Sequence, residues 1–159
     1  MNTSSFFRRP GRFLILRLAT IALVVLAWSS FAFGGEIHHA ALMGNLEKVK
    51  ALVEDNPHLV FSKDDNGDTP LHNAAITGHK AVAEFLVANK ADVNAKDNIG
   101  LTPLHCAALT RQKDMAEFLL ANKADVNAED KEGNTPLHYA WVNGDKEMTK
   151  LLRQHGGHH

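Results

Sequence analysis

The sequence predicts an all-α fold, a solenoid of about four helix-turn-helix repeats joined by β-hairpin loops. Two observations predict it. The phrase Thr-Pro-Leu-His occurs at residues 69–72, 102–105 and 135–138, with a strict spacing of 33 residues. Each copy follows an Asp-x-x-Gly turn and precedes a second apolar segment at helical spacing. A fixed period of this length is typical of a solenoid, in which each repeat buries its apolar face against its neighbours.

Residues 1–34 are predicted to be a leader. They contain no acidic residue, and an apolar run at 18–28 is followed by small residues. This order is typical of a secretory signal peptide, with cleavage after Ala32 or after Gly34. The basic residues that precede the apolar run are Arg8, Arg9, Arg12 and Arg17.

Two alternatives stay open for the leader. Residues 13–33 are long enough to span a bilayer as an uncleaved anchor, although Arg17 interrupts them. The pair Arg8-Arg9 also allows a twin-arginine route, although the residues after it match that signal loosely. The basic residues stay on the cytoplasmic side of the membrane whether the leader is cleaved or retained. We therefore expect a periplasmic or secreted protein, or one anchored with its repeats outside the cytoplasm.

Charge and cysteine content limit the classes of partner. All 18 acidic residues but only 13 of the 17 lysines and arginines follow Gly34, so that part carries a formal charge of −5. A modestly acidic protein is not expected to bind nucleic acid or an anionic lipid surface, and membrane contact is expected only through an uncleaved leader. Cys106 is the only cysteine, which excludes an intramolecular disulfide. We expect a monomer.

The predicted repeat domain covers residues 35–159, with repeats at about 35–63, 64–96, 97–129 and 130–157. The first repeat is degenerate, because His38 and Gly44 match the motif but Thr-Pro and the hairpin are missing, as in an N-terminal cap. The second helix of the last repeat presents charged residues, which suits a C-terminal cap. Those residues are Lys146, Glu147, Lys150 and Arg153.

Each repeat begins with a helix start signal. The threonine is expected at the N-cap and the proline at the first helical position. The leucine and the paired alanines form an apolar stripe, and Gly78 ends the first helix. A second helix follows, with Val82, Phe85 and Leu86 on its buried side. The motif residues are Thr69, Pro70, Leu71, His72, Thr102, Pro103, Leu104, His105, Thr135, Pro136, Leu137 and His138.

These phrases resemble the ankyrin repeat: Thr-Pro-Leu-His-x-Ala-Ala, then Gly-His, then Ala-Asp-Val-Asn-Ala, over residues 35–157. The resemblance implies that the motif histidines are structural and bond the threonine hydroxyl and the neighbouring repeat's backbone. Lys90 and Lys123 depart from the family pattern, which has glycine there in the left-handed conformation. Arg111 replaces the glycine that ends a first helix.

The remaining histidines and the cysteine do not predict chemistry. His155, His158 and His159 are expected to form a solvated tail, and Cys106 is expected to be an inert, partly buried thiol. Catalytic, cofactor-binding and metal-binding residues are all predicted to be absent, because no phosphate loop, nucleophile elbow or His-Glu-x-x-His motif occurs. The alternative is a small exported metal- or haem-handling accessory protein that uses its histidines.

The resemblance implies a binding surface for another protein, formed by the hairpin tips and the exposed face of the first helices. The tips are Asp65, Asn66, Asp68, Asn98, Ile99, Leu101, Lys131, Glu132 and Asn134. The helix positions are Ile76, Thr77, Leu109, Thr110, Val142 and Asn143. Ile99 and Leu101 are expected to form an apolar strip with Ile76, Leu109 and Val142. Trp141 is expected to plug the end of the core or, alternatively, to extend the groove.

The sequence therefore predicts an exported, non-enzymatic repeat protein that binds another protein through a rigid surface. A preformed surface loses little conformational entropy on association.

Overall fold

The computed structural model describes residues 35–158, and all of them belong to one compact unit. These residues form helices and loops without any strand, which confirms the predicted all-α class. Residues 35–42 are helical and precede α2 (Leu46–Asp55), η1 (Pro57–Phe61), α3 (Pro70–Thr77), α4 (Lys80–Ala88), α5 (Pro103–Leu109), α6 (Lys113–Ala121), α7 (Pro136–Val142) and α8 (Lys146–Gln154).

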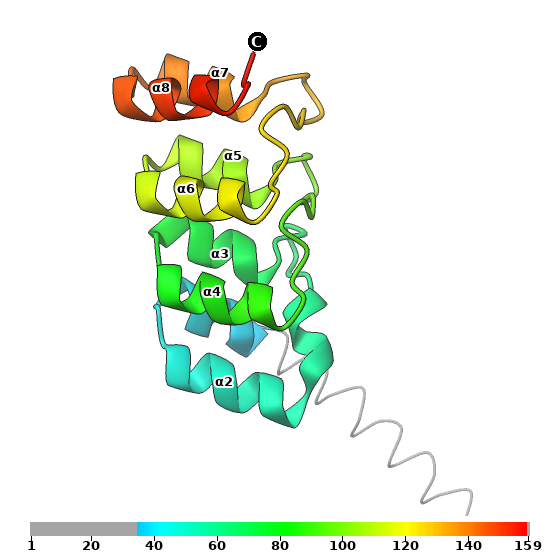
Figure 1. The fold of residues 1–159 in the computed structure, drawn as a ribbon. Coiled ribbons are helices and arrows are strands. Elements are labelled where there is room, and N and C mark those ends of the chain that lie inside the picture. The colour runs from blue at the N-terminus through cyan, green and yellow to red at the C-terminus, as the bar shows by residue number, and fades with distance from the viewer. Residues whose placement is uncertain (1–34, 159) are drawn as a thin grey trace, which may run out of the picture. The chain divides into compact units, whose positions relative to one another are not determined.

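The helices form two layers that run along the stack (Figure 1). The first helices of the repeats, α3, α5 and α7, pack side by side in one layer, and α2, α4, α6 and α8 pack in the other. The hairpin loops project from one side of the stack. Each helix pair contacts mainly the pairs before and after it, as expected for a solenoid.

The predicted leader lies outside the described residues, as do both of its possible cleavage positions and the alternative anchor at 13–33. Within residues 35–158, no helix combines the length and apolar character needed to cross a bilayer.

The repeat motif produces the helix boundaries. Thr69 and Thr102 have extended backbones and form capping boxes with the histidine three residues later, and proline follows at the first helical position. Gly78 ends α3 with a φ of 75°. Arg111 has a φ of 62° and so takes the left-handed conformation of Gly78 and Gly144 at the equivalent positions, while α5 ends at Leu109, one residue earlier than α3.

The core is built from the same positions in successive repeats. These buried residues are Leu71, Leu104 and Leu137 from the first helices, and Val82, Met115, Met148, Leu86, Leu119 and Leu152 from the second helices. The paired alanines Ala74-Ala75 and Ala107-Ala108 are fully buried, because the small side chain lets the helices of the next repeat approach closely. Burial of this apolar surface is the main term that stabilises the stack.

The loops between repeats have a hairpin hydrogen bond but no strand among the described residues. The Asp97 N–H donates to the carbonyl of Leu101 (2.9 Å). The carboxylate of Asp97 accepts hydrogen bonds from the N–H groups of Ile99 (2.9 Å) and Leu101 (2.8 Å), which fixes the turn locally. Successive tips are also connected, because the Asn98 N–H donates to the carbonyl of Asn66 (2.9 Å).

The first repeat replaces the hairpin by a short 3-10 helix. The side chain of Asn56 accepts a hydrogen bond from the His58 N–H (3.1 Å) and so starts η1. The ring of His38 lies 2.9 Å from the carbonyl oxygen of Asp68, which joins this cap to the next repeat.

Candidate functional site

The buried histidines of the central repeats are structural. The Thr69 N–H donates to His72 Nδ1 (3.1 Å), so the ring proton is on Nε2, which donates to the carbonyl of Leu101 (3.0 Å). The Thr69 hydroxyl oxygen lies 2.9 Å from the same Nδ1. His105 makes the equivalent bonds, and its Nε2 donates to the carbonyl of Asn134 (3.1 Å). Each ring therefore links its own helix start to the next hairpin.

Burial keeps these two rings neutral. It lowers the pKa of His72 below its ordinary value, although the bond to the Leu101 carbonyl and the nearby Asp68 partly offset the effect. Burial lowers the pKa of His105 in the same way, with a smaller opposing effect from the Asn134 carbonyl. A neutral ring with both nitrogens occupied is unsuited to hold a metal ion or to transfer a proton.

His138 departs from the predicted motif arrangement. It is half-buried, and Thr135 donates its hydroxyl to the carbonyl of His158 (3.0 Å) instead of pairing with the histidine. The ring of His138 packs edge-on against Tyr139, with 6.0 Å between the ring centroids. In the two preceding repeats the histidine ring reaches a hairpin carbonyl of the next repeat. At His138 the adjacent segment is the tail, and Thr135 bonds to it instead.

His155 and His158 are exposed, as expected for a solvated tail, but hydrogen bonds order the backbone of residues 156–158. The side chain of Asn127 accepts a hydrogen bond from the His158 N–H (3.0 Å) and donates to the carbonyl of Gly156 (3.2 Å). Asn94 makes the same two bonds to Asp125 and Lys123. The tail therefore continues the backbone pattern of the repeats, although the side chain of His158 is exposed.

The other candidates for chemistry lie in settings that do not favour it. Burial raises the pKa of the Cys106 thiol to about 12, so the nucleophilic thiolate is suppressed. Within residues 35–158 no group of three or more His, Cys, Asp or Glu side chains could hold a metal ion. His159 lies outside the described residues.

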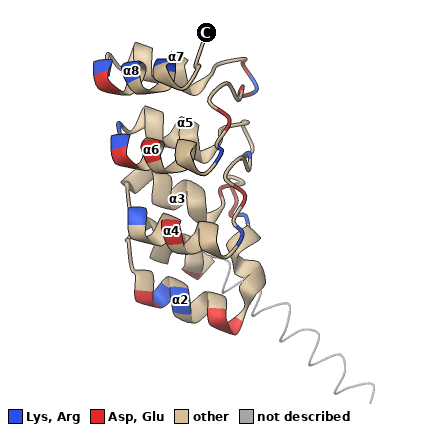
Figure 2. Cartoon of the chain, in the orientation of Figure 1, with Lys and Arg blue, Asp and Glu red and all other residues tan. Residues whose placement is uncertain are grey.

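The proposed partner surface contains three well-exposed apolar side chains. Ile99 is 60% exposed, Leu109 43% and Val142 62%, and Ile76 is half-buried at the equivalent position of α3. Their helices α3, α5 and α7 carry no charged residue, whereas charges are found on the second helices and the loops (Figure 2). We call Ile76, Ile99, Leu109 and Val142 the apolar column. Exposed apolar side chains with few charged residues around them are typical of the centre of an interface.

Leu101 does not belong to this surface. It is only 9% exposed, and its carbonyl accepts the bond from His72, so the prediction that it forms an exposed strip with Ile99 is wrong. Residues two apart share a face only in an extended strand. Here Gly100 turns the chain with a φ of 92°, which leaves Ile99 outside and directs Leu101 into the core.

The polar candidates on this surface are partly used by the fold. Asp65, Asn66, Asn98, Lys131 and Glu132 are exposed at the hairpin tips, while Asp68, Asn134, Thr77, Thr110 and Asn143 are half-buried. The hydroxyls of Thr77 and Thr110 donate to carbonyls of their own helices. The side chain of Asn143 donates to the carbonyl of Leu109 (2.8 Å) and so links two repeats.

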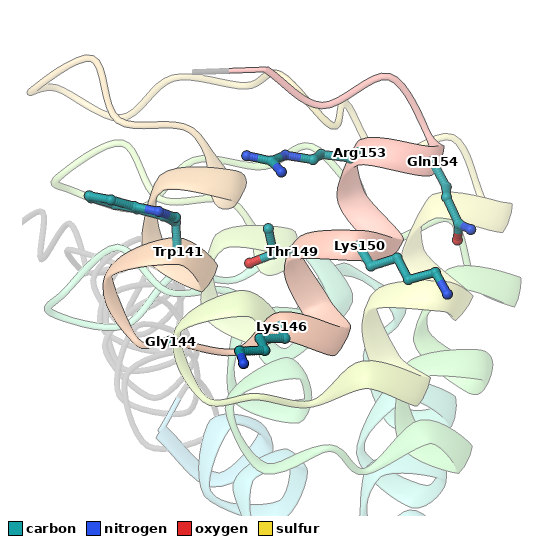
Figure 3. A pocket seen from close by; sticks show the side chains of 7 residues that line it. All are labelled: Trp141, Gly144, Lys146, Thr149, Lys150, Arg153 and Gln154. Atoms are coloured by element: carbon teal, nitrogen blue, oxygen red, sulfur yellow. The ribbon is translucent and has the colours of Figure 1, made fainter.

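Trp141 does not plug the core, contrary to the favoured prediction. It is 60% exposed and lies on α7 beside an open hollow of about 750 Å³ (Figure 3). The hollow is lined by Trp141, Gly144, Lys146, Thr149, Lys150, Arg153 and Gln154. The equivalent alanines, Ala75 and Ala108, are fully buried by the helices that pack on them.

Sequence reasoning placed the lysines and Arg153 in a solvated cap and did not connect them to a hollow. The aligned repeats nevertheless indicate this hollow. Thr149 takes the position of the buried Ala83 and Ala116, and Arg153 takes the position of Leu120. In the preceding repeats these positions pack against the next repeat. On α7 and α8 the same positions carry polar or bulky side chains.

Comparison with known proteins places the repeats among ankyrin proteins. Residues 37–97 and 97–159 match the family model described as ankyrin repeats (3 copies). The chain is 37% identical over 82 residues to human protein phosphatase 1 regulatory subunit 27, covering 52% of this chain and 49% of that protein. It is 39% identical over 59 residues to ankyrin repeat and SAM domain-containing protein 6 of Rattus norvegicus, covering 37% of this chain and 7% of that protein.

A third relative is alpha-latrotoxin-Lh1a of Latrodectus hasselti, which is 38% identical over 78 residues, covering 49% of this chain and 6% of the toxin. The chain therefore spans about half or much less of the length of these relatives.

Proposed function

Because the chain belongs to the ankyrin-repeat family, we propose that it is an exported, non-enzymatic module that binds another protein through its hairpin tips and the exposed face of α3, α5 and α7. Ankyrin repeats generally mediate protein–protein interaction, and proteins of this family are typically non-enzymatic. The regulatory phosphatase subunit among its relatives supports a protein as the partner.

The observation that carries the proposal is the apolar column on the uncharged helix layer. Leu109 and Val142 occupy the same position in successive helices that pack together, and Ile99 lies in the loop that leads into α5. A rigid row of this kind supplies the desolvated centre of an interface, and the polar hairpin tips supply its rim.

Export is proposed from the leader alone. A basic start, an apolar run and small residues precede the repeats, as in a cleaved signal peptide. An uncleaved anchor at 13–33 is the alternative form of the same proposal, and the repeats lie outside the cytoplasm in both.

The binding surface is tested by affinity capture with the wild type and with Ile99→Asp. We expect the exposed Ile99→Asp variant to fold normally and to lose at least about tenfold of its captured partner, because a charge then replaces an apolar side chain that the partner covers. The matched control is Phe61→Asp on η1, which also changes an exposed large apolar residue (51% exposed) to aspartate. Equal capture by all three proteins contradicts the proposed surface.

A further inference from the structure

The hollow between α7 and α8 lies on the face that receives the next repeat elsewhere in the stack. Ala75 and Ala108 on the first helices are fully buried there, as are Ala83 and Ala116 on the second helices. On α7 and α8 the equivalent residues are Trp141 and Thr149, which line the hollow. A tryptophan in place of the alanine prevents the close approach that a following ankyrin repeat needs, so this face is suited to a different occupant.

The hollow is positively charged. Lys146, Lys150 and Arg153 line it, and none of them forms an ion pair within residues 35–158. Lys150 replaces glutamate, which stands at the equivalent positions of the two preceding repeats, Glu84 and Glu117. At this position the last repeat therefore carries a positive side chain where the two preceding repeats carry a negative one.

Two carboxylates, one at the N-cap of α8 and one in its first turn, lie near the hollow but do not line it. Asp145 accepts the Met148 N–H (3.0 Å) as the N-cap of α8. Glu147 lines a separate hollow between α6 and α8 together with Glu117 and Lys150, so Lys150 borders both hollows. Figure 3 shows Thr149 between Trp141 on α7 and Lys150 on α8, while the indole ring and the Lys150 side chain extend away from each other on the two sides of the hollow.

We propose that this hollow binds an acidic peptide segment of another protein. Carboxylates of the segment pair with Lys146, Lys150 and Arg153, and an apolar side chain packs on Trp141. Tryptophan and arginine are the residue types that most often dominate binding energy at interfaces. Opposite charge adds specificity and a faster encounter.

An acidic peptide fits better than an anionic membrane. A lipid surface is broad and meets flat or convex protein surfaces, whereas these cations line one side of a hollow between two helices. Residues 35–159 also carry a formal charge of −5, which repels an anionic bilayer at longer range. The inference does not depend on the proposed function, because it concerns a different face of the repeats.

The test measures binding of a fluorescein-labelled peptide of alternating glutamate and leucine to the full chain, with a lysine–leucine peptide and anionic vesicles as parallel probes. Lys150→Glu and Trp141→Ala install the residues that the preceding repeats carry at those positions, so both variants are expected to fold. The matched control is Lys80→Glu, which changes the net charge equally at an exposed residue that begins α4.

We expect the acidic peptide to bind the wild type, with an affinity that falls as salt rises. Lys150→Glu is expected to weaken it at least about tenfold and Trp141→Ala about fivefold, while Lys80→Glu changes it less than about twofold. The proposal is overturned if the peptide does not bind, if Lys80→Glu weakens it as much as Lys150→Glu, or if only the vesicles bind. Capture through the apolar column remains a separate result, since Ile99→Asp does not alter the hollow.

Discussion

Lys90 and Lys123 hold backbone conformations that lysine rarely adopts. Their φ angles are 73° and 69°, and Gly156 stands at the equivalent position of the last repeat with a φ of 87°. A side chain with a Cβ in this region costs on the order of 1 kcal/mol. The sequence predicted this strain, because glycine is the family residue at these two positions.

We expect Lys90→Gly and Lys123→Gly each to raise the free energy of unfolding by up to about 1 kcal/mol, measured by urea denaturation. The gain is limited because glycine also increases the entropy of the unfolded chain. Lys80→Gly is the matched control and should lower the free energy of unfolding by at most about 1 kcal/mol, because Lys80 begins α4 and does not have a positive φ. Unchanged or lower stability for both glycine variants would contradict the assignment of strain.

Because the buried His105 has a lowered pKa, the free energy of unfolding depends on pH. The pKa of His105 is lowered in the folded state by burial, while the Asn134 carbonyl and nearby Asp130 oppose the shift. The unfolded chain therefore binds a proton at a higher pH than the folded chain does. The contribution of His105 is fully present above about pH 6.5 and is lost as pH falls through the lowered folded value, at up to about 1.4 kcal/mol per pH unit.

Urea denaturation of the wild type and of His105→Gln between about pH 7.5 and 5.5 checks this expectation. Glutamine does not titrate, so the variant should lose less stability than the wild type over that interval and the difference between the two should narrow at low pH. Parallel pH profiles would show that His105 is not kept neutral by the fold.

At the scale of one element, the last hairpin is fixed to the helix that follows it. The Tyr139 hydroxyl on α7 donates to the Asp130 carboxylate (2.6 Å), which also accepts the N–H groups of Glu132 (2.8 Å) and Asn134 (2.9 Å). Burial by itself would raise the pKa of Asp130, but these bonds outweigh it and lower the pKa to about 2. Burial and the bond to Asp130 raise the pKa of Tyr139 to about 12.

Tyr139→Phe should destabilise the protein by about 1 kcal/mol at neutral pH, because it removes a hydrogen bond to a partly exposed charged group. The ring is retained, so its edge contact with His105 (5.9 Å between centroids) is kept. We expect the pKa of Asp130, followed by NMR of its carboxyl carbon, to rise toward 3.8. Asp130 stabilises the fold above its unfolded pKa and loses this effect as pH falls toward 2, so the cost of the variant should disappear there. A constant cost at all pH values would point to altered packing.

At the scale of the whole molecule, repetition made the fold predictable. Equivalent residues meet equivalent neighbours in each repeat, so the motif at 69–72 also describes 102–105. Prediction failed where the environment stops repeating. Trp141 is exposed although its equivalents are buried, and His138 lacks the hairpin that His72 reaches. The prediction that Leu101 is exposed was wrong for a local reason, because the φ of Gly100 sets the direction of the side chain after the turn.

The leader and the repeats together predict where the protein is found. In a bacterial host, we expect the chain to be recovered outside the cytoplasm with its N-terminus at Phe33 or Gly35, as determined by mass spectrometry. The double variant Val24→Arg, Val25→Arg should remain inside and unprocessed, because each charge costs about 2.5–3.5 kcal/mol at the centre of a membrane segment. Ile99→Asp is the control, since it adds a charge to the repeats and leaves the leader unchanged. Uncleaved protein in the membrane fraction with its repeats accessible from outside would show that the leader is an anchor. Uncleaved wild-type protein in the cytoplasm would refute export.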